Sequence, residues 1–187
     1  MQKRAVIVHC WGATPQDNWY LWLKKELEKK GYQVEVPQMP ETEWPKIETW
    51  VPHLEKIVGT PDKKTILIGH SIGCQTVLRY VATLKKGQEI GGVICVAGWF
   101  VLKNIRSAHE KQVAAPWLET PLDEKEVKVH SKKIVALFSD DDPYVTLENK
   151  NIYEKRFGAA TTIIYKYKHV ECTQVPELLR SIQELSL

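Results

Sequence analysis

Short apolar runs alternate with segments of helical periodicity along most of the chain. The runs are rich in Val, Ile and Ala and nearly continuous, as expected for β-strands that are covered on both faces. They comprise Ala5–His9, Gln33–Val36, Thr65–Gly69, Gly91–Ala97, Ile134–Phe138 and Thr161–Tyr165. These runs predict about six strands, and no internal repeat or low-complexity linker separates them. We therefore expect a single domain over residues 1–187.

The segments between the runs have the spacing of amphipathic helices. Prolines at positions 45 and 52 leave the bounds of one of them, Glu43–Leu54, open. Asp17 or Asn18 is expected to cap the first helix, which Gly31 ends. The other expected helices are Trp19–Lys30, Ile72–Leu84, Leu147–Phe157 and Val175–Leu185. This alternation predicts an α/β fold: a mainly parallel sheet with helices on both faces and the ligand site at the carboxyl ends of the strands.

The composition is that of an ordinary globular protein and narrows the function classes. The net charge of +3 comes from interspersed lysines and glutamates, without a basic stripe, so we expect no nucleic-acid partner. No apolar stretch approaches the ~20 residues of a membrane span. The apolar run Ala5–Val8 is too short for a signal-peptide core, so we expect a cytoplasmic protein without a membrane partner. The four cysteines lack C-x-x-C spacing, which favours buried thiols over a zinc site.

The pentapeptide Gly69-His70-Ser71-Ile72-Gly73 stands between a predicted strand and a predicted helix. This G-x-S-x-G pattern is typical of the nucleophile turn of α/β-hydrolases. There the glycines allow close backbone approach, and the serine hydroxyl is exposed above the sheet. The alternative is an ordinary strand-to-helix turn with a solvated serine. A G-x-S-x-G pattern between a strand and a helix rarely arises by chance, which disfavours this alternative. We predict that Ser71 is a catalytic nucleophile.

A serine nucleophile needs a general base, and the base needs an orienting carboxylate. In α/β-hydrolases the acid and then the histidine follow the serine along the chain. The candidate acids Asp140, Asp141 and Asp142 directly follow a predicted strand, and they lack the spacing of a calcium loop. His169 follows the last predicted strand and is the expected base. The histidines that are placed less well are His53, His70, His109 and His130.

The oxyanion of the reaction needs backbone N–H donors. One is expected from Ile72, and the other from the loop after the first strand, where Trp11 is preferred and Cys10 is the alternative. Trp99 and Trp117 lie in loops after strands and are candidates for the wall of a substrate pocket. The segment Phe100–His130 occupies the position of a lid but is short, which predicts a minimal lid and an open site for small acyl groups.

The chain resembles the small serine-hydrolase family that includes retinoblastoma-binding protein 9, within the α/β-hydrolase superfamily. In that family the catalytic acid directly precedes a proline, which corresponds to Asp142 here. Two positions differ from most members: Cys10 and Lys168 stand where those members have glycine. The resemblance extends over nearly the whole chain and is carried by Asn18–Lys25, Met39-Pro40, Glu48–Trp50, Gly69–Ser71, Pro116–Pro121, Ser139–Val145, His169 and Pro176–Leu179.

The predicted residues and the resemblance together imply a serine hydrolase of carboxylic esters or amides, an esterase or amidase that forms an acyl-enzyme. The expected partner is a small-molecule ester or amide, and no cofactor or metal is expected. A protein-binding module on a hydrolase scaffold is the alternative, since the family name points to a protein partner. Acyl transfer to an acceptor other than water would use the same residues.

Overall fold

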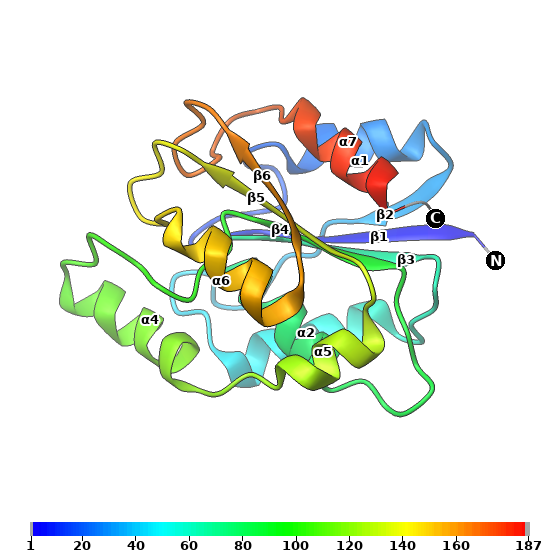
Figure 1. Ribbon diagram of the computed structural model, residues 1–187, viewed down its shortest axis with the longest axis horizontal. Helices are drawn as coiled ribbons and strands as arrows, with labels where there is room; N and C mark the ends of the chain where they lie inside the picture. The colour runs from blue at the N-terminus through cyan, green and yellow to red at the C-terminus, as the bar shows by residue number, and fades with distance from the viewer. Residues whose placement is uncertain (1, 186–187) are drawn as a thin grey trace.

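The computed structural model describes residues 2–185, whose strands form one six-stranded sheet (Figure 1). The strand order is β2-β1-β3-β4-β5-β6, and every neighbouring pair is parallel. All six carboxyl ends therefore lie along one edge of the sheet. The strands are β1 (Lys3–Val8), β2 (Tyr32–Glu35), β3 (Thr65–His70), β4 (Gly92–Val96), β5 (Ile134–Ser139) and β6 (Ala160–Ile164).

Helices cover both faces of the sheet, which confirms the predicted α/β architecture (Figure 1). The first and last helices, α1 (Tyr20–Glu28) and α7 (Pro176–Glu184), pack on one face. The remaining helices contribute to the core on the other face: α2 (Ile47–Val58), α3 (Ile72–Ala82), α4 (Ala108–Glu119), α5 (Glu124–His130) and α6 (Glu148–Phe157). None of the helices within residues 2–185 is long and apolar enough to cross a membrane.

The two-layer cover explains why the strands are almost continuously apolar. Along β1, Ala5 and Ile7 face the core under α1 and α7, while Val6 and Val8 face the core under α2 and α3. Burying both sets removes apolar surface from water on each side of the sheet, at about 25 cal/mol per Å². The edge strand β6 has only one buried residue, Ile164, and is correspondingly rich in threonine.

The start of α1 differs from the sequence expectation. The helix begins at Tyr20, and no side chain caps its first turn. The carboxylate of Asp17 instead accepts hydrogen bonds from the N–H and the hydroxyl of Thr14. Asn18 has a positive φ of 52° and donates its side-chain amide to the Tyr20 hydroxyl. Both candidate caps are thus used to shape the loop before the helix.

The other differences lie in α2 and in the segment Phe100–His130. Helix α2 continues through Pro52. Because proline has no N–H, the carbonyl of Glu48, four residues earlier, receives no helical hydrogen bond. Both Pro52 and Glu48 are exposed. Solvent can satisfy that carbonyl, so the proline does not end the helix.

The segment expected only as a short lid contains α4 and α5. Helix α4 begins with a capping box in which Ser107 and Glu110 exchange side-chain and backbone hydrogen bonds.

Candidate active site

Ser71 occupies a strained turn between β3 and α3. Its backbone adopts φ 54° and ψ −116°, a conformation that residues with a side chain rarely populate. Glycines two residues before and two residues after make the turn possible. A Cβ on Gly69 would lie 2.5 Å from the Cys74 nitrogen, and one on Gly73 would lie 2.4 Å from the Val8 carbonyl oxygen. The tight turn directs the Ser71 hydroxyl into a pocket at the carboxyl edge of the sheet.

His169 connects the Ser71 hydroxyl to a buried carboxylate. Its Nε2 lies 2.9 Å from Ser71 Oγ, and its Nδ1 lies 2.8 Å from Asp142 Oδ2. Because a carboxylate can only accept, Nδ1 carries the proton and Nε2 is free to accept the serine proton. The other oxygen of Asp142 accepts the N–H groups of Tyr144 and Val145 at 2.8 and 2.9 Å, which fixes the carboxylate. The three groups have the geometry of a Ser-His-Asp triad.

The two neighbouring aspartates hold the loop that carries His169. Asp141 Oδ1 accepts the Ser139 hydroxyl and the N–H of Lys168, and Asp140 accepts the N–H of Lys166. The Ser139 hydroxyl, and then the Lys168 N–H, lower the pKa of Asp141. These bonds also support Lys168 in the left-handed conformation, with φ 51°, at a position where glycine would meet no strain. Only Asp142 of the three lies against His169.

His70, which was placed less well than His169 as the base, links His169 to Tyr20 and the loop at Cys10. Its Nε2–H donates to the His169 carbonyl at 2.8 Å, and its Nδ1 accepts the Tyr20 hydroxyl at 2.7 Å. Burial lowers the pKa of His70 to about 4, so the ring is neutral at physiological pH. The Tyr20 hydroxyl in turn accepts the N–H of Cys10. Sequence reasoning rejected His70 as a base and had no signal for this supporting role, because the partners are distant in the chain.

The loop after β1 provides one clear candidate for an oxyanion donor. Since the Cys10 N–H donates to Tyr20 at 3.0 Å, it is already used, which leaves Trp11 as the donor on this loop. His9 holds the same loop through a bond to the Cys10 carbonyl and accepts the N–H of Met39. The second expected donor, Ile72, opens α3, where the first N–H groups have no partner within the helix. Trp11 and Ile72 both line the pocket.

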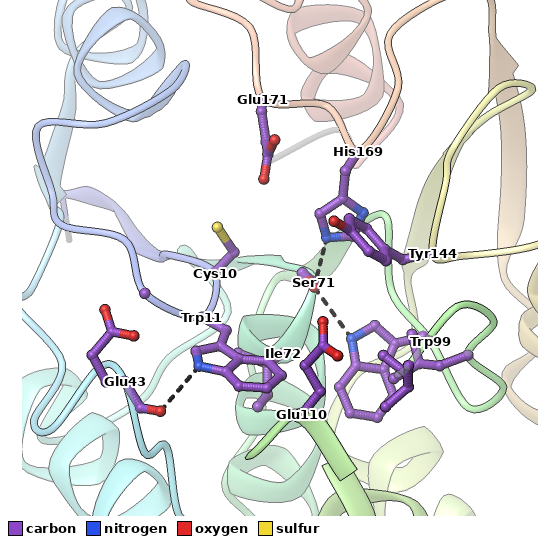
Figure 2. A pocket seen from close by; sticks show the side chains of 13 residues that line it. Cys10, Trp11, Glu43, Ser71, Ile72, Trp99, Glu110, Tyr144, His169 and Glu171 are labelled. Carbon is purple, nitrogen blue, oxygen red and sulfur yellow. Dashed lines mark hydrogen bonds between the residues drawn. The ribbon is translucent and has the colours of Figure 1, made fainter. Parts of the chain in front are cut away.

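The pocket has a volume of about 270 Å³ and holds Ser71 at its base (Figure 2). Trp99 lines it as expected. In addition, its buried indole N–H donates to Ser71 Oγ at 3.2 Å, on the side of the hydroxyl away from His169 (Figure 2). Leu102, Ile105 and Glu110 form a wall, so the short segment before and within α4 borders the pocket.

The expectation that Trp117 lines the pocket is wrong. Its side chain is 1% exposed and lies in the core, edge-on to Trp50. Its indole N–H donates to the Pro45 carbonyl at 3.0 Å. The prediction placed Trp117 in a loop after a strand, whereas it belongs to the last turn of α4 and faces inward. Arg79 of α3 holds that end of α4 by donating to the carbonyls of Trp117, Thr120 and Pro121.

One family profile and two known proteins are similar to this chain over most of its length. The sequence profile of the family described as serine hydrolase matches residues 5–177. YdeN of Bacillus subtilis is 27% identical over 169 residues, which cover 90% of this chain and 85% of YdeN. The serine hydrolase RBBP9 of Rattus norvegicus is 27% identical over 178 residues, which cover 93% of this chain and 89% of that protein.

Solved structures share the fold at lower sequence identity. The crystal structure of the ydeN gene product from B. subtilis has a TM-score of 0.87 and 24% identity, covering 98% of both chains. Est1E from Butyrivibrio proteoclasticus, with ferulic acid bound, has a TM-score of 0.76 and 15% identity, covering 98% of this chain and 88% of Est1E. A putative hydrolase of the alpha/beta superfamily from Xanthomonas campestris has a TM-score of 0.69 and 13% identity, covering 100% of both chains, so the overall fold is shared with these structures.

Proposed function

We propose that this chain, which belongs to the serine hydrolase family, hydrolyses carboxylic esters or amides of small acyl groups through Ser71, His169 and Asp142. The observation that carries the proposal is the His169 ring, which bridges Ser71 Oγ at 2.9 Å and Asp142 Oδ2 at 2.8 Å. A hydroxyl hydrogen-bonded to a general base, with the base oriented by a buried acid, is the arrangement needed for nucleophilic acyl transfer.

In the acylation step His169 Nε2 takes the Ser71 proton while Oγ attacks the substrate carbonyl carbon. Asp142 keeps the proton on Nδ1 and stabilises the imidazolium that forms. The protonated Nε2 then gives its proton to the departing alcohol or amine. The product of this step is an acyl group esterified to Ser71.

The negative charge of the tetrahedral intermediate needs donors that are already in place. Trp11 and Ile72 line the pocket with Ser71, and their N–H groups would receive the carbonyl oxygen. The network of Tyr20 and His70 supports this arrangement, since it joins the loop at Cys10 to the backbone of His169. Water activated by His169 then hydrolyses the acyl-enzyme and regenerates Ser71.

The size of the pocket favours small substrates. A volume of about 270 Å³ lies just below the lower end of the usual range for drug-sized ligand sites, which begins near 300 Å³. The acyl group and the reacting carbonyl must share this space. We therefore assign short or compact acyl groups rather than long fatty chains.

Covalent labelling with a fluorophosphonate tests the proposal. We expect wild-type protein to be labelled at Ser71 and to lose esterase activity, and we expect Ser71→Ala to be neither labelled nor active toward short p-nitrophenyl esters. Ser181→Ala is the matched control, since this buried serine lies in α7 and donates its hydroxyl to the Glu177 carbonyl of its own helix. Equal labelling of Ser71→Ala and wild type would overturn the assignment.

A further inference from the structure

Three carboxylates line the pocket that holds Ser71, whereas no lysine or arginine among the described residues does. Glu43 precedes α2, Glu110 lies in the first turn of α4, and Glu171 follows His169 in the loop before α7. In Figure 2 the three stand on different sides of the Ser71 hydroxyl. The pocket is therefore locally negative, although the whole chain carries a net charge of +3.

No ion pair neutralises these three glutamates within residues 2–185. The N–H of Ser107, then that of Arg106, and the Ser107 hydroxyl all donate to Glu110 Oε2 and lower the pKa of this carboxyl, so it stays ionised at neutral pH. Glu43 and Glu171 are exposed. The basic residues close to them in the chain are not lining residues: Lys46, Arg106, Lys111 and Lys168.

Aromatic rings and apolar side chains complete the wall. Trp11, Trp99 and Tyr144 line the same pocket as the carboxylates. The faces of such rings attract cations, and aromatic cages are a recurrent way to bind quaternary ammonium ligands. A neutral substrate would gain only the apolar contacts, and an anionic one would be repelled by three like charges.

We propose, on the premise that the serine hydrolase function above is correct, that the preferred substrates carry an ammonium group on the acyl chain. The acyl part is the portion that stays in the pocket through acylation and deacylation, so a charge there benefits from the carboxylates in both steps. The substrate class is then an ester or amide of an amino or quaternary-ammonium acid with a short carbon chain.

A pair of esters that differ only in charge tests this selectivity. The cationic member is p-nitrophenyl 4-(trimethylammonio)butanoate, and the neutral member is p-nitrophenyl 5,5-dimethylhexanoate, in which carbon replaces the nitrogen. Mono-p-nitrophenyl adipate supplies an anionic member. Each kcat/KM is divided by the rate constant for hydroxide hydrolysis of the same ester, which removes differences in inherent reactivity.

We expect the normalised kcat/KM at low ionic strength to be about tenfold higher for the cationic than for the neutral ester, and lowest for the anionic ester. Addition of ~0.5 M NaCl should bring the three values together because the carboxylates are accessible to screening ions. Equal or reversed values for the cationic and neutral esters would overturn the proposal.

Variants that replace the glutamates by glutamine test whether these carboxylates cause the preference for the cationic ester. Glu110→Gln should lower the cationic preference about two- to threefold, and the triple variant with Glu43→Gln and Glu171→Gln should abolish it. Glutamine can replace glutamate in a capping box, so α4 keeps its first turn. Glu119→Gln, on the same helix but outside the pocket, removes the same charge and should leave the preference unchanged.

The neutral ester separates this proposal from the proposed function. Turnover of the neutral ester by wild type and not by Ser71→Ala, without any preference for the cation, would support the hydrolase and refute the charge selectivity. If neither the neutral nor the cationic ester is turned over in a Ser71-dependent way, the proposed function itself fails. A preference retained by the triple glutamine variant would contradict the role of the carboxylates.

Discussion

The oxygen of Ser71 lies between the ring of His169, the proposed general base, and the indole of Trp99. His169 accepts on one side, and the indole N–H of Trp99 donates at 3.2 Å on the other. In the proposed mechanism partial negative charge develops on Oγ as its proton moves to His169, before that charge passes to the carbonyl oxygen, and during this interval the indole N–H donates to a charged acceptor. Such bonds contribute roughly 1.5–3 kcal/mol, about twice a neutral one.

Replacing Trp99 by phenylalanine removes the indole N–H that donates to Ser71 but keeps an aromatic ring in the pocket. We expect Trp99→Phe to lower kcat by about ten- to a hundredfold with a smaller change in KM, because the lost bond strengthens only as charge develops. The rate of fluorophosphonate labelling should fall in parallel. Steady-state kinetics with a neutral p-nitrophenyl ester and labelling time courses provide both measurements.

Trp117→Phe is the control for loss of a buried indole. Trp117 also donates its N–H to a backbone carbonyl but lies in the core and not in the pocket. We expect this variant to lose stability and keep its kcat. If Trp99→Phe keeps wild-type kcat and labelling rate, the hydrogen bond to Ser71 has no catalytic role.

For single residues, the sequence predicted the candidate triad but not the side chains that hydrogen-bond to it. Ser71 and His169 could be placed because strand ends in a parallel sheet meet at one edge, and the structure brings both together with Asp142. The contact between Trp99 and Ser71 could not be predicted, since the direction of a loop side chain depends on packing across the fold. The hydrogen bonds of His70 could not be predicted either, because its partners Tyr20 and His169 are distant in the chain.

The strand-to-helix turn at Ser71 depends on how closely α3 approaches β1. A Cβ at Gly73 would lie 2.4 Å from the Val8 carbonyl oxygen and 2.9 Å from that of His9. These are backbone atoms of β1 and of the loop that directly follows it, and they cannot move aside as a flexible side chain can. The close approach is therefore a property of two elements and not of the turn alone.

We expect Gly73→Ala to lower the free energy of unfolding by at least about 3 kcal/mol, since overpacking against backbone forces strands and helix apart. Gly158→Ala is the control: its φ of 65° is unfavourable for alanine, but a Cβ there meets nothing within 4 Å. That variant should lose only about 1 kcal/mol. Urea unfolding followed by circular dichroism compares the two, and similar losses in both would contradict the steric account.

The elements themselves differ in how well their sequence defines them. Strands β3, β4 and β5 are buried along their whole length, so their apolar runs mark them to within one or two residues. Helix ends were less predictable, because Asp17 bonds to Thr14 instead of capping α1. Helix α4 has few buried apolar residues, and Arg79 holds its end by donating to the carbonyls of Trp117 and Thr120.

The stability of the whole molecule should depend on pH through its buried histidines. In the folded protein burial lowers the pKa of His70 to about 4, whereas the unfolded chain has the ordinary value of 6.5. Burial also lowers the pKa of His9. The unfolded chain therefore binds more protons as the pH falls below 6.5, which favours unfolding, and the loss from His70 is complete near pH 4.

For His70 alone we expect the free energy of unfolding to fall by about 2 kcal/mol between pH 7.5 and pH 5. His70→Gln removes the titrating ring, so this part of the pH dependence should disappear from the variant, whatever its absolute stability. Urea unfolding of both proteins at the two pH values gives the comparison. An unchanged pH dependence in His70→Gln would show that the ring is protonated in the folded state or that other groups dominate.

The distances along the chain between interacting groups have a consequence for how the protein is made. Ser71 and His169 are 98 residues apart, and the Trp19 indole donates to the carbonyl of Val170, 151 residues later. During synthesis the turn at Ser71 leaves the ribosome long before its base does. On the proposed mechanism, a nascent chain therefore carries the serine without the means to activate it, and the site is complete only after translation has passed the last strand.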